Sequence, residues 1–196
     1  MNVPNKLTIS RFFLTVAFMA VIFSGMPFHQ TLALVLFVAA SLTDYFDGVI
    51  ARRNKLVTNF GILMDPLVDK IMICSAFIAF VGLHKIPAWM AVVIVARELA
   101  ITGLRLLAAS KQIVLAADAG GKAKTISQIV AIISILVMMS YGQWGAWGKA
   151  IFEFNIISGP WAAWFTQLAK WVAVILTFYS GVLYLWRNRR LYLQDL

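Results

Sequence analysis

The sequence is poor in charged residues and holds a single cysteine. Only 13% of its 196 residues are charged, 62% are hydrophobic, and the mean hydropathy is +0.85. Soluble globular domains carry about 25% charged residues, so this composition predicts a polytopic membrane protein. Cys74 stands alone, which excludes an intrachain disulfide. The N-terminal MNVPNKLTISR leads into an apolar run without a small-residue cleavage site, so we expect no signal peptide.

Long apolar runs separated by turn-forming residues predict an all-α integral membrane fold. The expected transmembrane helices lie near residues 10–26, 31–53, 58–83, 87–110, 121–141 and 162–187. Each is close to the roughly 20 residues that span a bilayer. We therefore expect one six-helix transmembrane domain over residues 1–196. The connection before the last helix is rich in Trp and Phe, which is typical of an interfacial loop.

Six spans place both termini on the same side of the membrane. Most lysines and arginines then fall on that side, with Lys70 and Arg97 left within the membrane. Cytoplasmic segments collect basic residues, so we expect both termini in the cytoplasm and a multi-pass protein of the inner (cytoplasmic) membrane. The net charge of +9 suits anionic lipid headgroups, and we expect no nucleic-acid partner.

Half of the eight acidic residues lie in one stretch, SLTDYFDGVIARRNKLVTNFGILMDPLVDK, residues 41–70. Helical spacing puts Asp44 and Asp47 on one face of the second expected helix and Asp65 and Asp69 on one face of the third. The two helices are antiparallel around a basic turn, so the four carboxylates can converge in a polar cavity that faces the cytoplasm.

Converging carboxylates in a low-dielectric setting need protons or cations. Oxygen ligands without Cys or His favour Mg²⁺, Mn²⁺ or Ca²⁺ over zinc. Two structural alternatives remain open at this point. The acids can pair with Lys70 or Arg97, and the small residues beside them can be ordinary helix-packing positions. Acidic residues inside a membrane are costly and usually functional, which favours a binding site.

The spacing D-x-x-D-G-x-x-A-R-x8-G-x3-D-x3-D resembles the signature of the CDP-alcohol phosphotransferase family. It is matched by Asp44, Asp47, Gly48, Ala51, Arg52, Gly61, Asp65 and Asp69. The resemblance implies six transmembrane helices, two divalent metal ions (Mg²⁺ or Mn²⁺) and a homodimer. It also implies transfer of a phosphatidyl group from CDP-diacylglycerol to an alcohol, with release of CMP.

The resemblance also implies roles for individual residues. The metal ligands would be Asp44, Asp47 and Asp65, with Asp69 as the general base that can also touch a metal. Donor binding would fall to Asn5, Thr8, Arg11, Gly48, Ala51, Arg52 and Gly61, with the small residues leaving room for the cytidine. Two positions have structural alternatives, because Thr8 can be a helix cap and Arg11 an interfacial side chain.

Three further segments resemble the branch of this family that uses glycerol 3-phosphate: PNKLTISR (4–11), ARELAITGLR (96–105) and GKAKTISQ (121–128). A dianionic acceptor needs cations near the metal site, and the candidates are Arg97, Arg105, Lys122 and Lys124. Within the membrane, Arg97 needs a partner such as a phosphate or Glu98. Alternatively, Arg97 pairs with an aspartate and the lysines meet lipid phosphates. Other acceptors (phosphatidylglycerol, inositol phosphate or serine) stay open, as does an ion-coupled transporter, against which no inverted repeat is visible.

Overall fold

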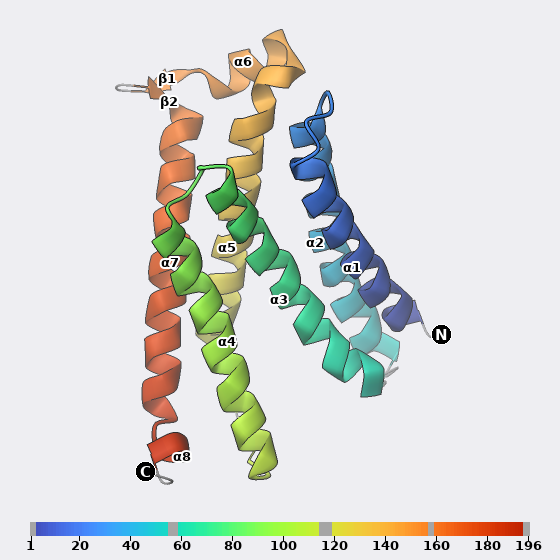
Figure 1. Ribbon diagram of the computed structural model, residues 1–196, viewed down its shortest axis with the longest axis vertical. Helices are drawn as coiled ribbons and strands as arrows, with labels where there is room; N and C mark the ends of the chain where they lie inside the picture. Colours follow the sequence, from blue (N-terminus) through green and yellow to red (C-terminus); the bar gives the residue numbers. More distant parts are fainter. Residues whose placement is uncertain (1–2, 55–58, 114–118, 157–158, 194–196) are drawn as a thin grey trace.

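The structure is a computed structural model that describes residues 3–54, 59–113, 119–156 and 159–193 (Figure 1). Helices dominate these ranges. The six long ones are α1 (Val3–Ile22), α2 (His29–Asn54), α3 (Asn59–Gly82), α4 (Ala88–Ser110), α5 (Ala119–Ser140) and α7 (Trp161–Arg187). Each of the six expected helices is confirmed as a helix, and most boundaries agree within two residues.

The first helix departs most from its predicted bounds, because it begins at Val3 rather than near residue 10. Pro4 does not prevent this, since a proline in the first turn lacks only a donor that would have had no partner within the helix. The helix ends four residues earlier than expected. Gly25 and Phe28 have positive φ angles of 65° and 60°, which are incompatible with a continuing helix.

The connection between α5 and α7 was expected to be a loop, and this was wrong for most of its length. A 3₁₀ turn (η1, Tyr141–Trp144) leads into a short helix, α6 (Ala146–Phe152). A two-stranded antiparallel hairpin follows, β1 (Asn155–Ile156) and β2 (Gly159–Pro160), with Asn155 opposite Pro160. Aromatic packing accounts for the order, since the Phe152 ring stacks on Trp161 at 6.0 Å between centroids.

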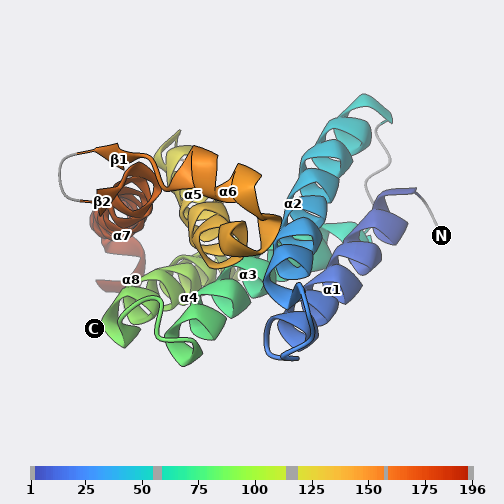
Figure 2. The same cartoon turned by 90° about the horizontal axis from the view of Figure 1, so that it is seen from above.

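The long helices run alternately up and down, so the two termini lie toward the same end of the long axis (Figure 1). The α6 segment and the hairpin lie at the opposite end, and the short helix α8 (Arg190–Leu193) lies beside the C-terminus. α1 packs against α2 and α3, α5 against α2 and α7, and α4 against α3 and α7. Figure 2 shows this arrangement from above.

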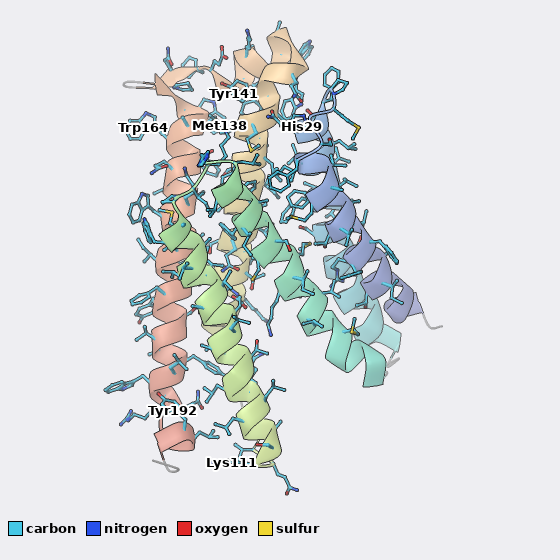
Figure 3. All side chains as sticks on the ribbon, viewed as in Figure 1. His29, Lys111, Met138, Tyr141, Trp164 and Tyr192 are labelled. Carbon is cyan, nitrogen blue, oxygen red and sulfur yellow. The ribbon has the colours of Figure 1, made fainter. Side chains whose placement is uncertain are left out.

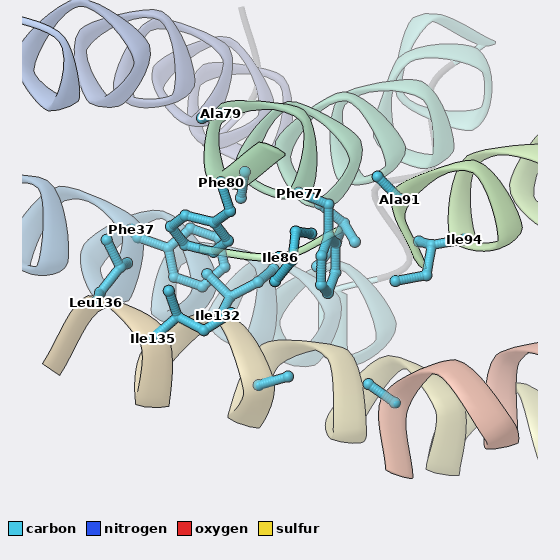
Figure 4. Close-up of a cluster of buried hydrophobic side chains, with 14 of the residues drawn as sticks. Phe37, Phe77, Ala79, Phe80, Ile86, Ala91, Ile94, Ile132, Ile135 and Leu136 are labelled. Carbon is cyan, nitrogen blue, oxygen red and sulfur yellow. The ribbon is translucent and has the colours of Figure 1, made fainter. Parts of the chain in front are cut away.

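A cluster of buried aromatic and aliphatic side chains joins α2, α3 and α5. Phe37, Phe77, Phe80, Ile132 and Leu136 are among its members, and each is at most 2% exposed (Figure 4). Burying such side chains contributes roughly 1.5–3 kcal/mol each when water is the reference. This cluster holds the middle of the helices together and thereby fixes the positions of the polar residues that precede it along α3 and α5.

The exposed surface is rich in large apolar side chains, whereas several polar side chains are buried. On α7, Trp164, Leu168 and Phe178 are exposed while Thr166 and Thr177 are buried. Extended apolar surface of this kind marks contact with a partner or with lipid. Two stretches, Gly121–Trp144 and Trp161–Arg187, are long and apolar enough to cross a membrane. These two stretches, found among the described residues, agree with the expectation of a membrane protein. Figure 3 shows the side chains.

Candidate functional site

The four aspartates of the motif lie on two helices that the first helix holds together. Asp44 and Asp47 are in α2, Asp65 and Asp69 are in α3, and α1 packs against both helices. Asp69 alone among them has a described side chain. The other predicted site residues whose side chains lie outside the described part are Asn5, Asp44, Asp47, Gly48, Ala51, Arg52, Gly61 and Asp65. Their roles stay predictions.

Asp69 is held by an arginine from the first helix. Arg11 Nη1 donates to Asp69 Oδ1 at 2.9 Å, and the Arg11 side chain is fully buried whereas that of Asp69 is 43% exposed. A charge-assisted hydrogen bond of this length fixes the carboxylate without covering it. The alternative that Arg11 is an interfacial side chain is wrong, because a guanidinium with no exposed surface reaches neither headgroups nor water.

Thr8 lies one turn before Arg11 and is also fully buried. Its interpretation as a helix cap is wrong, because α1 begins at Val3 and Thr8 is therefore inside the helix. One turn after Arg11, the Thr15 hydroxyl donates to the Arg11 carbonyl at 2.9 Å. Thr8, Arg11 and Thr15 thus form a buried polar stripe over successive turns of α1.

A second polar cluster lies where α3, α4, α5 and α7 meet. At its centre the Glu98 carboxylate of α4 accepts a hydrogen bond from the Lys124 ammonium of α5 and lies 3.5 Å from Arg97 Nη1. Both partners of the Glu98–Lys124 pair are buried, with 7% and 6% of their side chains exposed. Lys124 is therefore not a lipid-facing side chain. The acidic partner of Arg97 is its neighbour Glu98.

Lys70, which follows Asp69 directly, joins the same cluster. Its ammonium donates to Thr102 Oγ1 at 2.5 Å, and the Thr102 hydroxyl donates to the Glu98 carbonyl at 2.7 Å. The Thr102 hydroxyl thus donates its proton to the Glu98 carbonyl, and a lone pair of its oxygen accepts the hydrogen bond from Lys70. The charges of Glu98, Arg105, Arg97 and Asp69 all act on Lys70. The cluster thus lies beside the proposed base.

The position of the Arg97 side chain depends on a glycine of α7. A Cβ added at Gly181 would lie 2.8 Å from Arg97 Cγ, so only a residue without a side chain leaves room for the arginine stem. Arg97 Nε is buried and has no hydrogen-bond partner within the described part of the protein. Deeper in the bundle, Gln128 Nε2 donates to Thr177 Oγ1 at 2.9 Å.

The other two predicted acceptor residues are exposed. Arg105 Nε lies 3.5 Å from the Tyr184 hydroxyl, and its guanidinium carbon lies 5.8 Å from the centre of that ring. Lys122 is an exposed residue of α5, two positions before Lys124. The structure therefore brings Arg97 and Lys124 together around Glu98, leaves Arg105 at the rim within electrostatic range of Lys70, and does not pair Lys122 with this cluster.

Sequence reasoning missed the parts played by Lys70, Thr102 and Gly181. The signal for Lys70 was present, since a lysine next to a motif aspartate and within an expected span needs a partner. Thr102 and Gly181 gave no comparable signal. The described side chains contain no group of three or more His, Cys, Asp or Glu residues that could hold a metal ion. The side chains of Asp44, Asp47 and Asp65 lie outside this described part.

Comparison with known proteins agrees with the motif. The sequence model of the CDP-alcohol phosphatidyltransferase family matches residues 1–179. A CDP-diacylglycerol--glycerol-3-phosphate 3-phosphatidyltransferase of Bacillus subtilis (strain 168) is 38% identical over 95% of both chains. The protein of the same name from Rickettsia bellii (strain RML369-C) is 32% identical over 93% of both. A probable phosphatidylglycerophosphate synthase of Mycobacterium tuberculosis (strain ATCC 25618 / H37Rv) is 40% identical over 67% of this chain and 64% of that protein. The chain belongs to the CDP-alcohol phosphatidyltransferase family.

Proposed function

We propose that this protein transfers the phosphatidyl group from CDP-diacylglycerol to glycerol 3-phosphate, which gives phosphatidylglycerophosphate and CMP. The observation that carries the proposal is the position of Asp69. This last aspartate of the motif is fixed by Arg11, remains partly exposed, and lies beside a cluster of cations. The names of the relatives from Bacillus subtilis and Rickettsia bellii support the same donor and acceptor.

The reaction needs a base, an in-line approach and a stabilised leaving group. An acceptor hydroxyl attacks the phosphorus that carries the diacylglycerol, a new P–O bond forms, and the bond to the CMP oxygen breaks. Asp69 takes the proton of that hydroxyl. The exposed part of its carboxylate is open to the acceptor, while Arg11 holds the other part at 2.9 Å and prevents it from turning away.

We assign two divalent ions, Mg²⁺ or Mn²⁺, to Asp44, Asp47, Asp65 and Asp69. The donor set fits such ions, because it consists of carboxylate oxygens spaced i, i+3 on α2 and i, i+4 on α3, and so lies on one face of each helix. When bound, the ions would neutralise the pyrophosphate and favour departure of CMP. Donor binding is assigned to Asn5, Thr8, Arg11, Gly48, Ala51, Arg52 and Gly61.

The acceptor phosphate is assigned to Arg97, Arg105, Lys122 and Lys124. Support comes from the cluster around Glu98, where Arg97 of α4 and Lys124 of α5 both approach the same carboxylate. The charges of Glu98, Arg97 and Arg105 in turn act on Lys70, the neighbour of Asp69. A phosphomonoester is close to dianionic at neutral pH, so several cations at one place favour it over an uncharged alcohol.

The same proposal includes six membrane crossings within one catalytic domain, residues 1–196. The long helices have 20–27 residues, and 20 residues at about 1.5 Å each match the roughly 30 Å of hydrocarbon. Basic residues near the termini favour the cytoplasm for both ends and for the active site. We further propose that the protein lies in the inner membrane, in contact with its lipids, and works as a homodimer.

CMP release from CDP-diacylglycerol by the purified protein in detergent tests this function. With Mg²⁺ present we expect release with glycerol 3-phosphate and little with serine, inositol or phosphatidylglycerol. EDTA should abolish the release, and Mg²⁺ or Mn²⁺ should restore it. Preference for an uncharged acceptor would leave the family but remove the acceptor assignment. Full turnover in excess chelator would overturn the two-metal site, and no turnover with any acceptor would favour a transporter.

A further inference from the structure

Lys70 and Thr102 are not among the residues assigned to the proposed reaction, yet they connect the base to the cation cluster. Lys70 is the neighbour of Asp69 in α3, and its ammonium is anchored on the Thr102 hydroxyl of α4. That hydroxyl is itself fixed by its bond to the Glu98 carbonyl. The ammonium of a flexible lysine is therefore held at one point of the site by a side chain from another helix.

The charges around Glu98 do not balance. Lys70, Arg97 and Lys124 are three cations, and Glu98 is the carboxylate among them, so the described cluster has an excess of two positive charges. The charge of Asp69 also acts on Lys70, but Asp69 is itself paired with Arg11, and Arg105 adds a further positive charge, so the excess remains. An excess of like charge in a setting of low dielectric is costly unless an anion neutralises it. A phosphomonoester dianion carries the charge that is lacking.

An unused donor in the same cluster indicates where such an anion binds. Arg97 Nε is buried and has no hydrogen-bond partner among the described residues, although nearly all buried donors in folded proteins have one. The aliphatic part of the Arg97 side chain packs closely against Gly181, which limits the conformations in which the guanidinium could reach another partner. A phosphate oxygen beside Lys70 and Lys124 would satisfy this donor.

We infer that Lys70 is a further ligand of the acceptor phosphate, and that Thr102 and Glu98 position the cations that bind it. This inference rests on the proposed function and names the side chains that select the acceptor. Glu98 holds Lys124 and faces Arg97, whereas Thr102 holds Lys70. Together they arrange three cations from three helices around one anion site next to Asp69, which receives the proton of the acceptor hydroxyl.

Steady-state kinetics with Lys70→Met tests the ligand role. The substitution keeps the unbranched stem, one atom shorter, and removes the charge. We expect the KM for glycerol 3-phosphate to rise about tenfold or more, as for loss of a charge-assisted hydrogen bond, with the KM for CDP-diacylglycerol changed less than about twofold. Inorganic phosphate should compete with glycerol 3-phosphate in the wild type, and its inhibition constant should rise in parallel in the variant.

The matched pair Thr102→Val and Thr102→Ser tests positioning without changing any charge. Valine keeps the shape and loses the hydroxyl, so the KM for glycerol 3-phosphate should rise several-fold, and serine should restore it. This pair decides the question even if Lys70→Met does not fold. The control is Lys111→Met, since Lys111 is an exposed residue directly after the last residue of α4 (Figure 3) and lies outside the cluster.

The outcomes separate the inference from the function. If the wild-type protein does not use glycerol 3-phosphate, the proposed function fails and the inference fails with it. If the wild type uses it but Lys70→Met and Thr102→Val weaken both substrates equally, or lower kcat alone, the function stands and the inference is wrong. If Lys111→Met raised the KM for glycerol 3-phosphate as much as Lys70→Met does, the inference would be wrong. The acceptor would then be selected by the overall positive charge of the protein and not by this cluster.

Discussion

Removing one partner of the buried pair Glu98–Lys124 should strongly destabilise the protein, because the other charge is left buried without its partner. Both side chains are more than nine-tenths buried, so an unpaired charge left behind cannot recover its hydration. Breaking one partner of a buried ion pair typically costs about 3–5 kcal/mol. At about 2–4 °C per kcal/mol for a chain of this size, Tm should fall by roughly 6–20 °C.

The two single substitutions should differ, because Arg97 also faces the carboxylate at 3.5 Å. Glu98→Gln leaves Lys124 and Arg97 as two cations without their shared carboxylate, so its cost should lie toward the upper part of that range. Lys124→Met leaves Glu98 with Arg97 and should cost less. The double variant should cost less than the two single costs added together, by at least about 1 kcal/mol, since the residues are in contact.

The measurement is thermal unfolding in one detergent, followed by the fluorescence of the seven tryptophans. Lys149→Met serves as the control, because Lys149 is exposed on α6 and surface substitutions usually change stability by at most about 0.5 kcal/mol. Strict additivity of the two single substitutions would refute the reasoning, because it would mean that the two charges do not stabilise each other. Single variants as stable as the control would refute it equally.

Two further predictions concern the base and the glycine that accommodates Arg97. Asp69→Asn keeps the size of the side chain but cannot take the proton, so CMP release should fall roughly 10²-fold or more while CDP-diacylglycerol still binds; equal loss of donor affinity would make Asp69 chiefly a metal ligand. Gly181→Ala places a Cβ 2.8 Å from Arg97 Cγ, so it should destabilise by about 1–3 kcal/mol and raise the KM for glycerol 3-phosphate. Unchanged Tm and KM would show that Arg97 does not depend on this contact.

The helices and the aspartate motif could be predicted because both depend on local periodicity. Apolar runs of bilayer length gave the six long helices, and helical spacing placed Asp65 and Asp69 on one face before any contact was known. The aromatic connection after α5 was misjudged for a physical reason. Its order comes from packing between Phe152 and Trp161, and composition alone does not distinguish a packed interfacial segment from a loop.

The sequence by itself determined that this is a helical membrane protein of the CDP-alcohol phosphatidyltransferase family, and which residues are candidates for its chemistry. Only the tertiary structure decided which of them meet. Arg11 contacts Asp69 across 58 positions, Lys70 contacts Thr102 across 32, and Lys124 contacts Glu98 across 26. The approach and rotation of whole helices, which these contacts require, follow from packing summed over many side chains, so no local pattern encodes them.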